Sequence, residues 1–315
     1  MTPKRWKQIN QIVTWSFLIV TVSLLFLYLG KIEWRTVWRM LVNTNHETIV
    51  STLLLVALSY TIYYGIFDLI GQAWCGHKLQ KRQVMLIAFI CYAFNMSLST
   101  WVGGVAMRYR LYSRLGLTAG SITRIFSLSI ATNWVGYMLV AGAIYSSGLT
   151  PLPAGWIIGG RTLQSIGITL LIATSLYLAL CAGSPRYHLK IRGNKMTLPS
   201  LRLALLQCIA SASNWMIMAT IIWLLMAREP PWSAVSGVLL VSSIVGVVIH
   251  IPAGAGVLGV VFLALLGGEN LSHNAILAAL LTYRLLYFLI PLLLASVLYL
   301  WFERHHALRS PDHGL

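Results

Sequence analysis

The chain has 315 residues, of which 58% are hydrophobic and 10% charged, and its formal net charge is +16. Apolar runs recur along the whole length, each close to the roughly 20 residues that cross the hydrocarbon core of a bilayer. The composition predicts a single integral membrane domain over residues 1–315 and argues against a soluble nucleic-acid-binding module. In such a protein the lysines and arginines indicate topology first, because they collect in cytoplasmic loops.

Six apolar runs are long enough to cross the membrane completely. The first follows a basic N-terminal segment but is longer than the apolar part of a signal peptide, so we expect it to be retained as a helix. The six expected spans cover residues 12–30, 47–70, 120–147, 162–183, 201–226 and 275–302.

Two further apolar segments are interrupted. The run from Gln83 to Trp101 is followed by Val102-Gly103-Gly104 and then by a basic segment that begins near Arg108. The run from Ser233 to Gly267 is broken at residues 250–256, and its distal limb has about 11 residues, which reach only about 16 Å in a helix. Non-helical backbone inside a membrane is tolerated only where protein or water covers it. Both segments are therefore predicted to be re-entrant hairpins whose breaks mark a site.

The distribution of charge supports this topology. With a cytoplasmic N-terminus, two re-entrant hairpins place most lysines and arginines on the cytoplasmic face, whereas two full crossings separate the basic clusters at 108–114 and 184–200. The C-terminal tail, 303–315, is then cytoplasmic as well. The predicted fold is an all-α integral membrane protein with eight apolar segments, of which about six are full transmembrane helices and two are broken-helix hairpins. The halves, approximately 1–147 and 162–302, form an inverted repeat, an architecture of many secondary transporters.

Three ionisable residues lie in or beside the apolar runs. Arg284 is far inside the last run, where a charge usually faces the bundle interior or a water-filled cavity; its alternative role is to cap carbonyls of a broken helix. Asp68 either forms a salt bridge with Lys78 or Arg108 or carries a coupling proton. His250, beside the second break, either titrates or donates to a lipid headgroup, or bonds to carbonyls of the loop.

The other candidates surround the two breaks. Arg108 could meet a lipid phosphate entering from the cytoplasmic leaflet, or it could be an ordinary topology charge. Asn95 belongs to a set of intramembrane amides and hydroxyls that either line a polar path or bond between helices. Helix N-termini beside the breaks could donate N–H groups to phosphate. The remaining candidate residues are Trp101, Gly103, Gly104, Pro252, Gly254 and Gly256.

Catalytic patterns are not visible. The chain has only 7 acidic residues without a closely spaced pair, and it carries no HExxH, GxSxG or P-loop pattern. The 4 cysteines are widely separated, which gives no CxxC metal spacing. We therefore expect a protein that is not an enzyme and that uses no metal or cofactor.

Several segments carry a family likeness: 89–95, 100–108, 110–117, Ile251 to Leu258, and Tyr283-Arg284 before Pro291. In these segments the chain resembles the transmembrane region of the lysylphosphatidylglycerol synthase/flippase family. The resemblance implies a lipid-handling domain in a bacterial inner membrane, of the kind linked to moving aminoacylated phosphatidylglycerol between leaflets. The soluble aminoacyl-transfer domain has no counterpart here, so synthase activity is not implied. The chain departs from the family pattern at Gly259, where relatives carry glutamate, and at Ala253, where they carry glycine.

These observations predict a flippase-like protein that binds an anionic phospholipid or related lipid and moves it between leaflets. Arg284 and the two glycine-rich breaks would form its headgroup site near the middle of the membrane. The alternative is a membrane scaffold or regulator of lipid synthesis, whose partner would be a lipid-synthesis enzyme.

Overall fold

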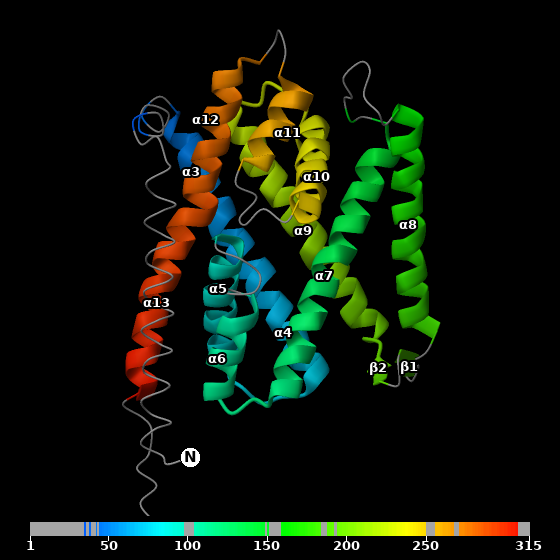
Figure 1. Cartoon of the computed structure of the whole chain (residues 1–315), viewed down its shortest axis with the longest axis vertical. Helices are drawn as coiled ribbons and strands as arrows, with labels where there is room; N and C mark the ends of the chain where they lie inside the picture. The colour runs from blue at the N-terminus through cyan, green and yellow to red at the C-terminus, as the bar shows by residue number, and fades with distance from the viewer. Residues whose placement is uncertain are drawn as a thin grey trace, which may run out of the picture.

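The computed structural model describes residues 35, 38, 42, 44–97, 104–148, 150, 159–183, 188–191, 194–249, 256–267 and 271–307. These residues form a bundle of helices with one short pair of strands (Figure 1). The predicted span at 12–30 and the tips of both breaks lie outside the described residues. The candidate site residues outside them are Trp101, Gly103, His250, Pro252 and Gly254.

Five helical stretches of the described residues are long and apolar enough to cross a membrane, which confirms the predicted class of all-α integral membrane protein. Two of them contain a π-helical turn that divides each into two α-helices. The stretches are α3 (His46–Ser59), η1 (Tyr60–Gly65) and α4 (Ile66–Cys75); α7 (Ala119–Ser146); α8 (Gly160–Gly183); α9 (Leu201–Leu225); and α12 (His273–Arg284), η4 (Leu285–Leu289) and α13 (Ile290–Ala307). They match the predicted spans from 47–70 to 275–302 within a few residues.

Polar residues define where several of these helices begin. Thr118, Ser200 and Ser272 each accept a hydrogen bond from the backbone N–H three residues later, at the starts of α7, α9 and α12. Such caps satisfy N–H groups that have no partner within the helix. The polar stretch between α8 and α9 contains a feature that the sequence did not suggest, an antiparallel pair of strands, β1 (His188–Ile191) and β2 (Asn194–Thr197).

The two interrupted segments form two pairs of helices, each with one longer and one shorter member. They are α5 (Lys81–Ser97) with α6 (Met107–Arg114), and α10 (Trp232–Ile249) with α11 (Val257–Leu266). In Figure 1, α5 and α6 occupy the lower part of the bundle and α10 and α11 the upper part. This is the arrangement that re-entrant hairpins from opposite faces would have. The inverted repeat and the number of spans stay predictions.

Packing differs between the centre and the edge of the bundle. Helix α5 is enclosed, with Ile87, Ala88 and Ile90 fully buried. Helix α8 lies at the edge, and its exposed residues include Ile166, Ile168, Ile172, Leu176 and Leu180, as expected for contact with lipid tails. Helices α7 and α9 approach closely at Gly136, where the position of a side chain is already occupied by Ser211. Small residues allow such close approach between helices in membranes.

Candidate functional site

Arg284 is the last residue of α12, half-buried, and is followed directly by the π-helical turn η4. Proline at 291 explains why the helix changes here. Its ring has no N–H and collides with the carbonyl four residues earlier, so the preceding turn must widen or bend. The interruption lies inside the stretch His273–Arg304, which is long enough to span a membrane. Arg284 therefore lies within a span, as the sequence predicted, and at an irregular turn of that span.

Side chains from other helices hold the carbonyl groups of this turn. The hydroxyl of Tyr60, at the start of η1, donates to the carbonyl oxygen of Tyr287 at 2.9 Å. The hydroxyl of Ser97, the last residue of α5, donates to the carbonyl oxygen of Phe288 at 3.3 Å. Because Ser97 is the last residue of α5, the end of α5 that leads to the first break lies against the turn that follows Arg284.

In the second helix pair, α11 packs against the first part of the same span, α12. A Cβ atom at Gly259 in α11 would lie 3.7 Å from Cδ2 of Leu277 in α12. Helix α11 begins after Gly256, whose φ of 90° is accessible mainly to glycine, and no side chain caps its N-terminus. Helices α11 and α12 run in opposite directions along each other, so this N-terminus points toward the Arg284 end of α12. A helix N-terminus carries partial positive charge, which favours anions.

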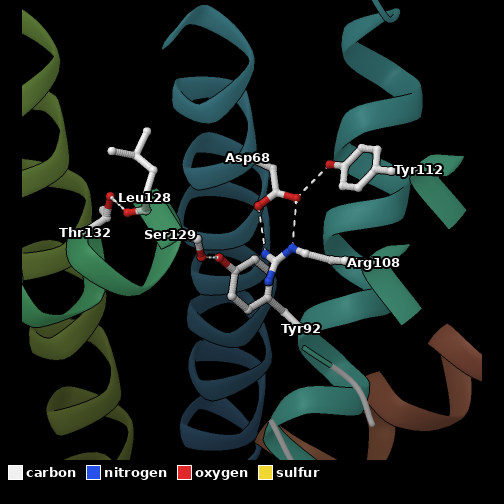
Figure 2. A network of polar contacts seen from close by, with 7 residues as sticks. All are labelled: Asp68, Tyr92, Arg108, Tyr112, Leu128, Ser129 and Thr132. Carbon is white, nitrogen blue, oxygen red and sulfur yellow. Dashed lines mark hydrogen bonds and ion pairs between the residues drawn. The ribbon is translucent and has the colours of Figure 1, made fainter. Parts of the chain in front are cut away.

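Asp68 and Arg108, two predicted candidates, form a buried ion pair between α4 and α6 (Figure 2). Nη2 of Arg108 lies 2.8 Å from Oδ1 of Asp68, and Nε lies 3.4 Å from Oδ2. The hydroxyl of Tyr112 donates to Oδ2 of Asp68 at 2.6 Å. The exposed fractions of the Arg108 and Asp68 side chains are 1% and 0%. Of the alternatives for Asp68, the structure contains the salt bridge with Arg108, and the pair is buried inside the protein.

The guanidinium of Arg108 also lies over two aromatic rings. Its Cζ atom is 4.5 Å from the ring centroid of Tyr92 in α5 and 5.4 Å from that of Phe126 in α7. Tyr92 itself is hydrogen-bonded to Ser129 of α7. The Arg108 charge is thus held by groups from three other helices. Contact between Arg108 and a lipid phosphate stays a prediction, and it would require Arg108 to leave this environment.

Helix α6 carries two more arginines that face a second carboxylate. Nε of Arg110 lies 2.9 Å from Oε1 of Glu303 in α13, and Arg114 bonds to the other carboxylate oxygen. Sequence reasoning missed Glu303, Tyr60 and Tyr112. For Glu303 a signal existed, since three arginines in one short helix need partners and acidic residues are scarce in this chain. For the tyrosines no spacing in the sequence indicated their partners.

Asn95 and Gly104 lie in the described part of the first break region. Gly104 is buried in the turn that leads into α6. Oδ1 of Asn95 is buried and has no hydrogen-bond partner among the described residues. Since Asn95 is two residues before Ser97, this acceptor lies at the end of α5 that meets the Arg284 turn. Asn214, another intramembrane amide, instead accepts a hydrogen bond from Ser59 between α9 and α3.

In the described residues no group of three His, Cys, Asp or Glu side chains could hold a metal ion. The groups near the Arg284 turn that could bind a ligand are Arg284 itself, Oδ1 of Asn95 and the N-terminus of α11. These groups suit an anion that also carries hydrogen-bond donors.

Comparison with known proteins adds one extensive likeness. The chain is 53% identical to the inner membrane protein YbhN of Escherichia coli (strain K12) over 299 residues, which are 95% of this chain and 94% of that protein. It is 28% identical over 246 residues to an uncharacterized protein, slr0712, of a Synechocystis species, covering 77% and 76% of the two chains. No family model matches the sequence. The likeness to lysylphosphatidylglycerol synthases stays an expectation from the sequence.

Proposed function

Because the chain belongs to the family of the inner membrane protein YbhN and is a multi-pass inner-membrane protein, we propose that it moves a lipid across that membrane. The proposed substrate is an anionic phospholipid or a related lipid, which is bound and carried between leaflets without chemical change. One observation carries the proposal: the C-terminal end of α5 contacts the turn that follows Arg284 inside a membrane span, and α11 of the other helix pair packs along α12, the helix that Arg284 ends.

Arg284 provides the chemical reason for an anionic headgroup. A charged side chain at membrane depth is costly, and it usually faces the bundle interior and marks a substrate pathway. A phosphodiester accepts two parallel hydrogen bonds from a guanidinium, which Lys cannot reproduce. The N-terminus of α11 adds positive potential on the side opposite to α5. Oδ1 of Asn95 would accept from a hydroxyl or ammonium group of the headgroup.

The arrangement of the helix pairs supports movement between leaflets. Figure 1 shows α5 and α6 on one side of the middle of the bundle and α10 and α11 on the other. A headgroup bound between them would reach one leaflet when the first pair moves away and the opposite leaflet when the second does. Alternating access of this kind, around a fixed site formed by discontinuous helices, is common in secondary transporters.

The proposal is tested with the purified protein in vesicles that contain phosphatidylglycerol labelled on its headgroup with a fluorophore. The label remaining in the outer leaflet is measured with a membrane-impermeant quencher over time. The wild type should exchange label faster than protein-free vesicles, and Arg284→Ala should reduce exchange to the protein-free rate. Arg161→Ala, which alters an exposed arginine at the start of α8, is the matched control and should behave as the wild type.

Equal exchange by the wild type and by a folded Arg284→Ala variant would exclude the assigned site. Exchange by the wild type no faster than in protein-free vesicles would exclude the transport function itself. In that case, co-purification of a lipid-synthesis enzyme with the full chain would support the alternative role as a scaffold or regulator.

A further inference from the structure

The carbonyl oxygen of Tyr287, near Arg284, lacks its ordinary donor because of Pro291 and accepts a hydrogen bond from a distant residue instead. In an α-helix the N–H of residue 291 would donate to the carbonyl of Tyr287, but residue 291 is proline and has no N–H. The hydroxyl of Tyr60 donates to this same oxygen at 2.9 Å. Both tyrosines are buried, with exposed fractions of 4% and 0%. A side chain from η1 therefore supplies a donor where proline removes the ordinary one.

We infer that Tyr60 is a positioning residue for Arg284, because it stabilises the wide turn that sets the direction of the arginine side chain. The inference rests on the proposed function, in which Arg284 binds the headgroup. Tyr60 itself touches no substrate in this role. It acts through the backbone of η4, the turn that begins directly after Arg284.

The geometry of a π turn explains why such a bond matters. A π turn contains one residue more than an α turn, and each residue in an α-helix rotates the chain by about 100°. If η4 tightened into an α turn, Arg284 would rotate by about that angle relative to α13. The guanidinium would then face a different neighbour. Whatever holds η4 open therefore also decides which side of the bundle Arg284 faces.

Contacts between η1 and η4 reinforce this arrangement. The ring centroids of Tyr60 and Tyr287 are 5.5 Å apart. The side chain of Ser59, the residue before Tyr60, lies 2.7 Å from the hydroxyl of Tyr287. Tyr287 is thus bound from α3 and η1 at both its backbone and its side chain. The bond from Tyr60 differs from the others because it replaces the donor that Pro291 lacks.

This dependence can be measured with a double-mutant cycle in the full-length protein. Tyr60→Phe removes only the hydroxyl, and Pro291→Ala restores an N–H at residue 291. The first readout is the unfolding temperature in detergent. Tyr60→Phe should lower it in the wild-type background and should lower it by less than half as much in the Pro291→Ala background. An equal loss in both backgrounds would overturn the inference, because the hydroxyl would not then replace the proline's missing donor.

Tyr137→Phe is the matched control for this cycle. Its hydroxyl also donates to a backbone carbonyl inside the bundle, that of Leu240, at 3.0 Å. It is buried to a similar degree, with an exposed fraction of 5%. Because this bond lies between α7 and α10, its loss should lower the unfolding temperature equally with proline or alanine at 291.

The second readout tests whether Tyr60 positions Arg284 for lipid binding or only stabilises the fold. Binding of phosphatidylglycerol to the full chain is measured in mixed micelles well below the unfolding temperature, with wild type, Tyr60→Phe, Arg284→Ala and the double variant. Tyr60→Phe should weaken binding about fivefold, the scale of one hydrogen bond, and should weaken it no further when Arg284 is already alanine. Unchanged binding in Tyr60→Phe would overturn the positioning role. Equal binding by wild type and Arg284→Ala would instead overturn the lipid site. The double-mutant cycle in unfolding temperature would still test the hydrogen bond from Tyr60 to Tyr287.

Discussion

Asp68 and Arg108 neutralise each other inside the bundle, with 2.8 Å between Oδ1 and Nη2 and almost no exposure of either side chain. The pair joins α4 to α6 across the first interrupted segment. It gives α6 a defined position in an environment where an isolated charge would be very costly. The opposite helix pair, α10 and α11, contains no charged residue and is held by apolar packing and by hydrogen bonds to its carbonyls, such as that from Tyr137.

Removing one member of the pair should be far worse than removing both. Asp68→Ala leaves a buried guanidinium without its carboxylate, which costs about 3–5 kcal/mol in comparable cases. Asp68→Leu combined with Arg108→Met should recover most of that loss, because an apolar pair of similar volume often replaces a buried ion pair without cost. Thermal unfolding in detergent measures both. A double variant as unstable as Asp68→Ala would contradict the prediction.

The second carboxylate, Glu303, should matter less than Asp68. Its partners Arg110 and Arg114 have side-chain exposures of 14% and 28%, so water and salt screen the attraction. Glu303→Gln should therefore cost at most about 1 kcal/mol, as most partly exposed pairs do, and the difference from wild type should shrink in high salt. Unfolding temperatures at low and high salt provide the measurement. A salt-independent loss as large as that of Asp68→Ala would show that the pair is effectively buried.

Two glycines should respond oppositely to alanine. At Gly136 a Cβ atom would overlap Ser211, so Gly136→Ala must push α7 from α9 and should cost about 1–3 kcal/mol. At Gly259 the nearest atom to a Cβ is 3.7 Å away, so Gly259→Ala should be neutral or stabilise by up to about 1 kcal/mol through helix propensity. Unfolding temperatures of the two variants test this contrast. An unchanged unfolding temperature in Gly136→Ala would show that the α7–α9 contact is not tight, and equal losses at both positions would contradict the predicted contrast.

Cysteine labelling tests whether the interrupted segments are re-entrant. In a cysteine-free background, Lys78→Cys and Ala119→Cys flank α5 and α6 at exposed positions. Glu229→Cys and His273→Cys flank α10 and α11 in the same way. A membrane-impermeant thiol reagent added to intact cells should label the second pair and not the first, which would also place the N-terminal half as predicted. Labelling of only one member of either pair would mean that the segment crosses the membrane.

The positions of the membrane spans could be predicted from the sequence, whereas the contacts between them could not. The positions of α7, α8, α9 and the last span were predictable because a helix that crosses a bilayer must be apolar over a set length. The π turn at η4 has a cause that is visible in the sequence, Pro291. The π turn η1 contains no proline and could not be predicted. Arg284 could be singled out because a charge in an apolar run is costly wherever the chain places it. The residues that surround Arg284 could not be predicted from the sequence.

The sequence by itself determined that this is an all-α integral membrane protein with two interrupted segments, because length, apolar composition and glycine-rich breaks are local properties. Only the tertiary structure decided which groups meet. Tyr60 reaches the carbonyl of Tyr287 across 227 positions, and Asp68 reaches Arg108 across 40. In lipid every helix is apolar on most of its surface, so hydrophobic pattern alone does not select neighbours. Hydrogen bonds, ion pairs and close packing between particular side chains select them, and these exist only once the helices are together.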